Sequence, residues 1–394
     1  KSQLYNNNTN NLKYLSVEQA LMDYVVLIHH LKKVYKFEAV IGFGGSYGGM
    51  LASWARIRYP NIWDGVIASS APILAFEGLE QYLINGSNFF AEGLIYDISN
   101  SNNNLCQQNL DMVFVQKALL SVDPTLLRSS FRVCSDDNTT DEDLGWSATN
   151  WINNALSYMA MGNYPYESGY ILGGDGYLPP FPINVACDQF QQRNTSNSTL
   201  IIDYDEWLQD LAAFAGVYYN HSHKQLSCNY LSDPNANNEK AIDTLWDYQY
   251  CTQIFMIGGQ GPDKYDLYWN ESWDGDSTAE RCFHKYGIYP DRQHFAMRYG
   301  TPQDWSTTTS NIVWTQGEYD PWRGGGVVTG FDSSSSLHVL TIPKGAHHLD
   351  LFFSHENDTQ EVIDVRKFEM QQVRKWIVEK KKNRKKEIIS IQQQ

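Results

Sequence analysis

The chain lacks several features that would assign it to other classes of protein. No apolar run among its 394 residues is long enough to cross a membrane, so we predict no transmembrane segment. Positive charge is scarce, because 30 lysines and arginines stand against 45 acidic residues, and the net charge of −15 argues against a nucleic-acid partner. The cysteines form no Cys-x-x-Cys pair, which disfavours a structural zinc site.

The chain does contain enough apolar sequence, 42% of its residues, for one large or two medium globular domains. Its six cysteines all lie between residues 106 and 282, which predicts three disulfides and leaves their pairing open. Triplets of the form Asn-x-Ser/Thr are frequent and begin at Asn7, Asn85, Asn138, Asn194, Asn197, Asn220, Asn270 and Asn357. Disulfides and N-linked glycans together favour an oxidising, glycosylating compartment.

A serine between glycines, in Gly44-Gly45-Ser46-Tyr47-Gly48-Gly49-Met50, follows a β-rich run at 37–43. This is the layout of a nucleophile elbow, the sharp strand-to-helix turn that exposes a catalytic serine. Glycines two positions before and after the serine are expected to let the chain bend without a Cβ clash. The pattern predicts covalent acyl transfer by Ser46, although so short a motif also arises by chance.

The flanking segments predict a parallel α/β arrangement around that serine. A helix is predicted at 50–56 and a buried strand at 63–68. Upstream, residues 16–19 resemble a capping box, and apolar side chains recur at helical spacing at Ala20, Tyr24, Leu27 and Leu31. The order helix, strand, elbow, helix, strand is typical of a parallel sheet with helices on both faces.

Two later strands each lead to a residue that would complete a catalytic triad. The predicted strand at 311–317 is followed by Asp320, and the strand at 337–342 is followed by His347 and His348. In an α/β-hydrolase the acid and then the histidine follow the serine along the chain. This order predicts Asp320 as the acid and either His347 or His348 as the base.

Three motifs together resemble the S28 family of serine peptidases. They are Gly-Gly-Ser-Tyr-Gly-Gly-Met at 44–50, Gly-Glu-x-Asp-Pro-Trp-x-Gly-Gly-Gly at 317–326 and Gly-Ala-His-His-Leu-Asp-Leu at 345–351. The resemblance runs from near Lys1 to about residue 376. It implies a triad of Ser46, Asp320 and His347, the first of the two histidines. The backbone N–H of Tyr47 would supply one oxyanion donor.

The resemblance also implies an α/β-hydrolase core at 1–75 and 306–380, a mostly helical cap inserted at 76–305, and a basic, polar tail at 381–394. Apolar residues at helical spacing support a helical cap independently, at Leu110, Val113, Phe114 and at Trp207, Leu211, Phe214, Tyr218. A separate domain with its own role is the alternative. The family's disulfide pairing, carried over by order, implies Cys106–Cys187, Cys134–Cys228 and Cys251–Cys282.

Members of this family favour proline before the scissile bond, which implies a compact apolar pocket. Met50, Met256 and Trp322 match positions that line it, and ordinary core packing is the alternative reading of Met256. The implied activity is that of a serine exopeptidase on peptides with proline near a terminus, acting as a carboxypeptidase or a dipeptidyl peptidase. An esterase or lipase and a non-catalytic binding protein on a hydrolase scaffold are the other candidates.

The same resemblance implies a lysosomal, vacuolar or secreted protein and is compatible with a homodimer. We expect no metal or other cofactor, since the ligand-like spacing of His221-Ser222-His223 has no acidic residue close by in sequence. The chain opens on Lys1-Ser2 without a leader, and only one helix precedes the nucleophile strand. We therefore expect that the N-terminal strands of the core and the second oxyanion donor lie upstream of Lys1.

Two positions differ from the family pattern, and the C-terminal end carries a run of basic residues. Family members commonly carry Arg where this chain has Phe352, which puts in question any tuning of the histidine by a guanidinium at that place. The usual Cys-Thr-Glu reads Cys251-Thr252-Gln253, without the carboxylate. The basic run at 380–386 is interpreted as the solvated end of a final helix, with a sorting or membrane-surface role as the alternative.

Overall fold

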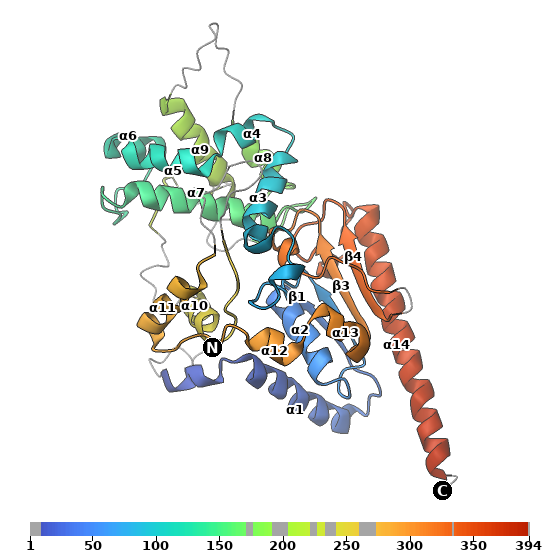
Figure 1. Cartoon of the computed structure of the whole chain (residues 1–394). Helices are drawn as coiled ribbons and strands as arrows, with labels where there is room; N and C mark the ends of the chain where they lie inside the picture. Colours follow the sequence, from blue (N-terminus) through green and yellow to red (C-terminus); the bar gives the residue numbers. More distant parts are fainter. Residues whose placement is uncertain are drawn as a thin grey trace.

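A computed structural model of the chain describes residues 9–170, 176–190, 204–220, 227–232, 242–259, 273–332 and 335–392. At its centre lies a four-stranded parallel sheet in the order β1-β2-β3-β4 (Figure 1). The strands are β1 (Ile41–Gly45), β2 (Gly65–Ser69), β3 (Ile312–Gly317) and β4 (Leu337–Ile342). Because all four are parallel, the loops that follow β1, β3 and β4 meet at one end of the sheet.

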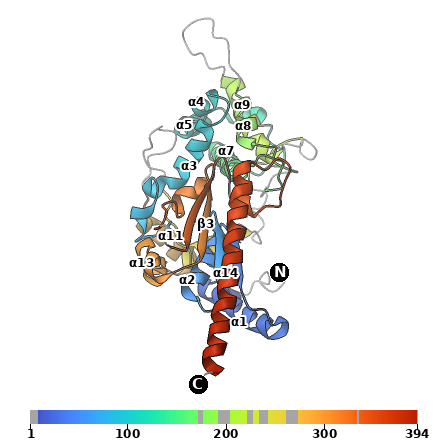
Figure 2. The same cartoon turned by 90° about the vertical axis from the view of Figure 1, so that its right-hand side faces the viewer.

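Helices cover both faces of the sheet. Alternate residues of β2 and β3, such as Ala68 and Trp314, pack with Trp54 of α2 (Tyr47–Arg58) and with α1 (Val17–Tyr35). The residues between them, Ile67 and Val313, pack with α14 (Gln360–Gln392), which runs along the opposite face in Figure 2. The alternation follows from the two-residue period of a strand and gives the predicted α/β class its buried core.

A second group of helices stands over the carboxyl ends of the strands in Figure 1 and has its own apolar core. Its members are α3 (Phe89–Ser99), α4 (Leu105–Asn109), α5 (Met112–Ser121), α6 (Pro124–Ser130), α7 (Leu144–Met161), α8 (Pro182–Cys187) and α9 (Tyr204–Tyr219). The disulfides Cys106–Cys187 and Cys134–Cys228 belong to this group. We call this group the upper cap.

Two further helices, α10 (Ile242–Thr252) and α11 (Gly275–Tyr286), lie beside the core and are joined by the disulfide Cys251–Cys282. All three disulfides therefore have the pairing that the family resemblance implies. The helices α12 (His294–Tyr299) and α13 (Pro302–Thr308) fall within the predicted cap range, yet they pack in the same apolar cluster as α2. The domain limits at 76 and 305 stay a prediction.

The start of α1 agrees with the sequence, but its buried face does not. The Ser16 hydroxyl accepts a hydrogen bond from the Gln19 backbone N–H, as a helix N-cap does. Of the predicted apolar stripe, Tyr24 is 40% exposed and Leu27 51% exposed, whereas Val17 and Leu21 are buried. Apolar residues occur all around this helix, so their spacing alone does not choose a face.

The cap predictions had mixed outcomes. In α9 the residues Trp207, Leu211, Phe214 and Tyr218 are all buried, which confirms the predicted stripe. The other stripe is wrong, because Leu110 precedes α5 and Phe114 is 44% exposed. The buried face of α5 consists of Met112, Val115, Ala118 and Leu119.

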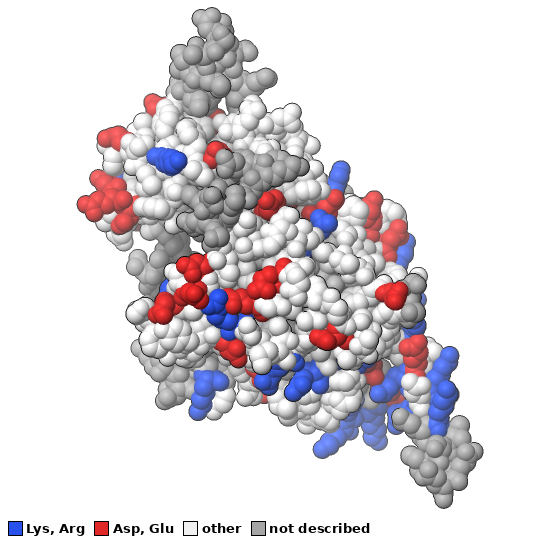
Figure 3. All heavy atoms as spheres, viewed as in Figure 1, with Lys and Arg blue, Asp and Glu red and all other residues white. Residues whose placement is uncertain are grey.

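The basic run at 380–386 continues α14 beyond the sheet. Lys380 pairs with Asp64 at 3.0 Å and Arg384 with Glu38 at 2.7 Å. In Figure 3 the basic side chains gather at this end of the molecule, and acidic side chains are spread over the rest of the visible face. Across the described residues, no helix has the length and apolar composition of a membrane span.

Candidate active site

Ser46 sits at a strained turn between β1 and α2. Its backbone has φ 56° and ψ −127°, a conformation that costs a non-glycine residue about 1–3 kcal/mol. Its N–H donates to the carbonyl oxygen of Ser69 at 2.9 Å, which ties the turn to β2. The turn lies at the carboxyl end of the sheet, as the predicted elbow requires.

The elbow requires glycine at positions 44 and 49, whereas the sequence pattern predicts positions 44 and 48. A Cβ on Gly44 would lie 2.1 Å from the carbonyl oxygen of Gly48, so glycine is required there. A Cβ on Gly48 would meet open space, and the expectation for that position is wrong. The close approach falls instead on Gly49, where a Cβ would lie 2.9 Å from the Ser69 carbonyl oxygen.

Asp320 and His347 are in direct contact at the same end of the sheet. The Nδ1 atom of His347 lies 2.9 Å from Oδ2 of Asp320, and the two residues are 1% and 2% exposed. The other oxygen, Oδ1, accepts the backbone N–H of Trp322 at 3.0 Å in η4 (Pro321–Gly325). Since Asp320 engages Nδ1, Nε2 is the ring nitrogen left for proton transfer.

The neighbouring His348 occupies a different environment. It has φ 42°, and its backbone N–H donates to the Ser70 hydroxyl at 2.7 Å. A Cβ on Gly45 would lie 3.1 Å from the His348 ring, so the histidine loop lies directly against the residue before Ser46. Burial and the adjacent His347 lower the pKa of His348 to about 4, which keeps its ring neutral near pH 7.

The Phe352 that replaces the family's arginine stacks on His348, with ring centroids 5.8 Å apart and planes at 14°. A guanidinium still reaches this loop, but it comes from α14. Arg366 donates to the carbonyl oxygens of Leu349 at 2.9 Å and Asp350 at 2.8 Å. The arginine thus holds the backbone of the histidine loop.

Tyr47 is the first residue of α2, so its N–H has no acceptor within the helix. Its side chain is held by α10. Gln249 donates to the Tyr47 hydroxyl at 2.6 Å, and the Trp246 ring packs edge-on against Tyr47 at 5.7 Å. The start of α2 is therefore held in place by α10, which lies about 200 residues away in sequence.

An apolar cavity of about 310 Å³ lies beside this site, between the core, the upper cap and α10. Two of the three predicted pocket residues, Met256 and Trp322, line it. Met50 does not line it, and at 2% exposure it packs in the core cluster beneath α2. The sequence missed the aromatic lining residues Phe89, Phe90, Trp246, Tyr250 and Trp273. Among the residues described, no charged side chain lines this cavity.

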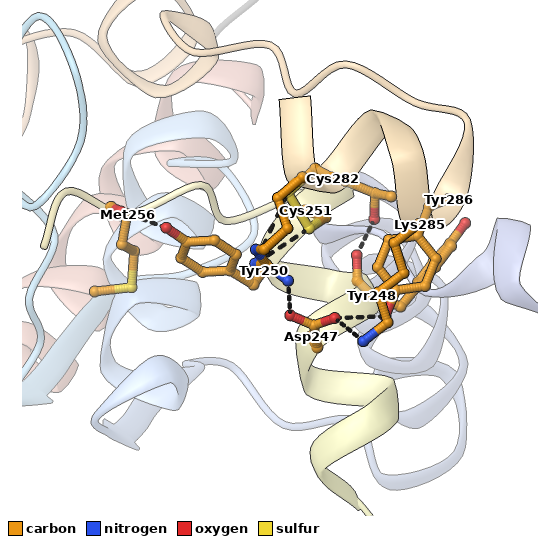
Figure 4. Close-up of polar contacts among 10 residues, drawn as sticks. Asp247, Tyr248, Tyr250, Cys251, Met256, Cys282, Lys285 and Tyr286 are labelled. Carbon is orange, nitrogen blue, oxygen red and sulfur yellow. Dashed lines mark hydrogen bonds and ion pairs between the residues drawn. A yellow bond between two sulfur atoms is a disulfide. The ribbon is translucent and has the colours of Figure 1, made fainter. Parts of the chain in front are cut away.

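One wall of the cavity is fixed through polar contacts of α10, α11 and the following segment (Figure 4). The Tyr250 hydroxyl donates to the Met256 carbonyl oxygen at 3.0 Å. Asp247 accepts hydrogen bonds from Lys285 and Tyr286, each at 2.7 Å, and from Arg281. Burial alone would raise the pKa of Asp247, but these hydrogen bonds lower it to about 2, so the carboxylate stays charged.

Comparison with known proteins identifies the family. The family model described as Serine carboxypeptidase S28 matches residues 1–369. The human protein "Lysosomal Pro-X carboxypeptidase" is 33% identical over 378 residues, which cover 93% of this chain and 69% of the human one. The chain belongs to the S28 family. It is a serine-type peptidase.

Other relatives give the same picture. The bovine "Lysosomal Pro-X carboxypeptidase" is 32% identical over 377 residues, covering 93% of the S28 chain and 69% of the relative. The Caenorhabditis elegans "Prolyl carboxy peptidase like protein 5" is 30% identical over 408 residues, covering 97% and 76%.

The predicted glycan acceptors of this S28 peptidase fall into three groups. Asn85, Asn138 and Asn357 are exposed, and Asn220 is half-buried. The other acceptors, Asn7, Asn194, Asn197 and Asn270, lie outside the described residues, as does His221-Ser222-His223. Within the described ranges, no three His, Cys, Asp or Glu side chains are grouped so as to hold a metal ion.

Behind the histidine loop of the S28 peptidase lies a pair of buried carboxyl groups. The Ser69 hydroxyl donates to Asp350 Oδ1 at 2.5 Å, and the Thr315 hydroxyl donates to Glu369 Oε1 at 2.8 Å. Burial and the neighbouring Asp350 raise the pKa of Glu369 to about 9, and burial raises that of Asp350. Because the two buried carboxyls would repel each other if both were ionised, at least one proton stays with the pair at neutral pH.

This pair predicts a fold that weakens as the pH rises. The folded-state pKa of Glu369, about 9, is above its ordinary value of 4.5, so its stabilising effect is complete below about pH 4.5 and is lost by about pH 9. The loss is at most about 1.4 kcal/mol per pH unit. Denaturant unfolding of Glu369→Gln should match wild type near pH 5 and show a more stable protein near pH 8. If the unfolding free energies of Glu369→Gln and wild type differed by the same amount at both pH values, this prediction would be contradicted. The control is Glu361→Gln, at an exposed position of α14.

Proposed function

We propose that this S28 peptidase cleaves peptides after a proline near the C-terminus, with Ser46 as nucleophile, His347 as base and Asp320 as the orienting acid. The observation that carries the proposal is the buried 2.9 Å contact between Asp320 and His347, at the end of the sheet where the strained Ser46 follows β1. An acid, a base and a nucleophile on the loops of one sheet end are the parts of an acyl-transfer site.

In the proposed mechanism Nε2 of His347 takes the proton of Ser46 while Oγ attacks the peptide carbonyl carbon. Asp320 holds Nδ1–H, which selects the tautomer and stabilises the imidazolium that forms. The backbone N–H of Tyr47 donates to the developing oxyanion. His347 then protonates the leaving amine. In the second half of the reaction His347 takes a proton from a water molecule that attacks the acyl-enzyme, and it returns this proton to Ser46 Oγ as the ester bond breaks.

The cavity beside Trp322 supports a preference for proline. Its lining is aromatic and thioether in character and carries no charged side chain among the residues described, which suits a pyrrolidine ring. Trp322 is two residues from Asp320, so a ring in this cavity would lie next to the proposed catalytic loop. The relatives' names, Pro-X and prolyl carboxypeptidase, favour release of a C-terminal residue.

We further propose that the protein works in an acidic, lysosome-like compartment. Three buried carboxyls, Asp97, Asp350 and Glu369, have pKa values raised by burial and are neutral in acid. Such groups favour the folded state most at low pH. The human and bovine relatives are named lysosomal, which agrees with this preference.

A single peptide tests the specificity. It carries proline at its second and its penultimate positions, and the products formed by the full-length protein are weighed by mass spectrometry. Loss of one C-terminal residue is expected. Loss of an N-terminal dipeptide would replace the proposal by a dipeptidyl peptidase, and cleavage away from both prolines would end the proline assignment. The Ser46→Ala variant, which keeps the pocket, is the control and should leave the peptide intact.

A further inference from the structure

The end of α7 holds the peptide groups on both sides of His347. The His347 N–H donates to the Met161 carbonyl oxygen at 3.1 Å, and the His347 carbonyl oxygen accepts from the Tyr164 hydroxyl at 2.8 Å. Both bonds are shielded from water, since Tyr164 is 0% exposed and His347 1%. Met161 is the last residue of α7, and Tyr164 follows it in the connection between the upper-cap helices α7 and α8, 183 positions from His347.

Tyr164 is itself fixed from several sides. Its carbonyl oxygen accepts from the Phe181 N–H at 2.7 Å, immediately before α8. Its ring packs on Phe352 at 4.7 Å and on Tyr166 at 6.1 Å. Phe352 in turn stacks on His348, so the aromatic contact continues into the histidine loop. The hydroxyl therefore has little freedom to turn away from the His347 carbonyl.

The same helix end also contacts the apolar cavity. The Met161 sulfur accepts from the indole N–H of Trp322 at 3.2 Å, and Trp322 lines the cavity. The segment 161–164 therefore makes two kinds of contact. The Met161 side chain contacts Trp322 in the lining of the apolar cavity. The Met161 carbonyl oxygen and the Tyr164 hydroxyl contact the backbone of His347, the proposed base.

We propose that Tyr164 is a positioning residue through which the upper cap sets the place of the catalytic imidazole. The inference rests on the proposed role of His347 as base. Asp320 fixes the orientation of the imidazole ring, but it does not fix the backbone from which the ring extends. The His347 backbone is held by Met161 and Tyr164. The position of the upper cap relative to the core therefore determines the position of His347 Nε2.

The step that depends most on this position is proton transfer from Ser46. A displacement of reacting groups by about 1 Å can lower a rate by about 100-fold. Without the Tyr164 hydroxyl, the His347 carbonyl oxygen would be left buried without a partner, and the loop would have to shift to reach one. Substrate binding in the cavity involves other residues and should change little.

The test is Tyr164→Phe in the full-length protein. We expect kcat on an X-Pro peptide to fall about 10-fold to 100-fold per titrated active site, with KM within about twofold of wild type. The labelling rate of Ser46 by a phosphonate probe should fall by a similar factor, and the acidic limb of the kcat/KM pH profile, which reports deprotonation of the imidazole, should move. Tyr166→Phe is the matched control, because this buried tyrosine packs on Tyr164 and its hydroxyl has no bond to the His347 peptide.

An unchanged kcat and an unchanged pH profile in Tyr164→Phe would overturn the inference, even if the melting temperature fell. Equal losses in Tyr164→Phe and Tyr166→Phe would also overturn it, because they would indicate general loosening of the cap. Should Tyr164→Phe fold poorly, single-turnover labelling at low temperature, normalised to titrated sites, measures the same ratio. The proposed function fails separately, if His347→Ala retains activity.

Discussion

Asp320→Asn is expected to lower kcat by about 10⁴-fold while KM and the melting temperature change little. The asparagine oxygen can still accept the Trp322 N–H, so η4 keeps its place. The asparagine nitrogen, however, would donate to Nδ1 of His347 where the carboxylate now accepts. The imidazole would then carry its proton on Nε2, the nitrogen that has to accept the proton of Ser46. Steady-state kinetics and thermal melting of the full-length variant measure both expectations.

The control for this prediction is a nearby carboxylate with a different task. Glu318 accepts from the Tyr96 hydroxyl at 2.9 Å and from the Lys344 N–H at 3.0 Å. It does not contact a histidine ring, so Glu318→Gln should retain kcat within a few-fold. A loss below about tenfold in Asp320→Asn, or equal losses in both variants, would contradict the assigned role of Asp320.

The two adjacent histidines should differ by orders of magnitude. We expect His347→Ala to lower kcat by about 10⁴-fold or more, because the variant lacks the base that we propose takes the Ser46 proton. His348→Asn should lower it by less than about tenfold. His348 has a left-handed backbone conformation that asparagine tolerates, and its bond to Ser70 comes from the backbone N–H, which the substitution keeps.

These variants are compared by kcat per titrated active site on the same X-Pro peptide. The wild-type pH profile adds an independent check, since burial and the adjacent His347 lower the pKa of His348 to about 4, and this ring would titrate only near that pH. The reverse order of effects, with His348→Asn inactive and His347→Ala active, would exchange the roles of the two residues.

Local patterns were enough to predict the strands and the order of the site residues. The runs that form β2 and β3 are wholly buried, which gives them their largely apolar sequences, whereas β4 is buried only at its first and last residues. Asp320 and His347 follow β3 and β4 within a few residues, and Ser46 follows the partly buried β1 directly. A parallel sheet brings the ends of these strands together whatever their separation, so the sequence could predict that the three residues lie at one end of the sheet.

Contacts between distant segments could not be predicted in this way. The choice between His347 and His348 depends on which ring meets Asp320, and nothing local to the pair decides it. The exposure of Tyr24 on α1 and the burial of Met50 beneath α2 depend equally on what packs against each helix. The Tyr164 bond to His347 spans 183 positions, and a tyrosine in a loop carries no signal of such a partner.

The most direct test of the account is covalent labelling of the full-length S28 peptidase with a fluorophosphonate, followed by peptide mapping of the adduct. The account predicts one adduct, on Ser46, absent in Ser46→Ala and formed much more slowly in His347→Ala. An adduct on another serine, or no adduct on Ser46 in a folded wild-type protein that cleaves peptides, would contradict it.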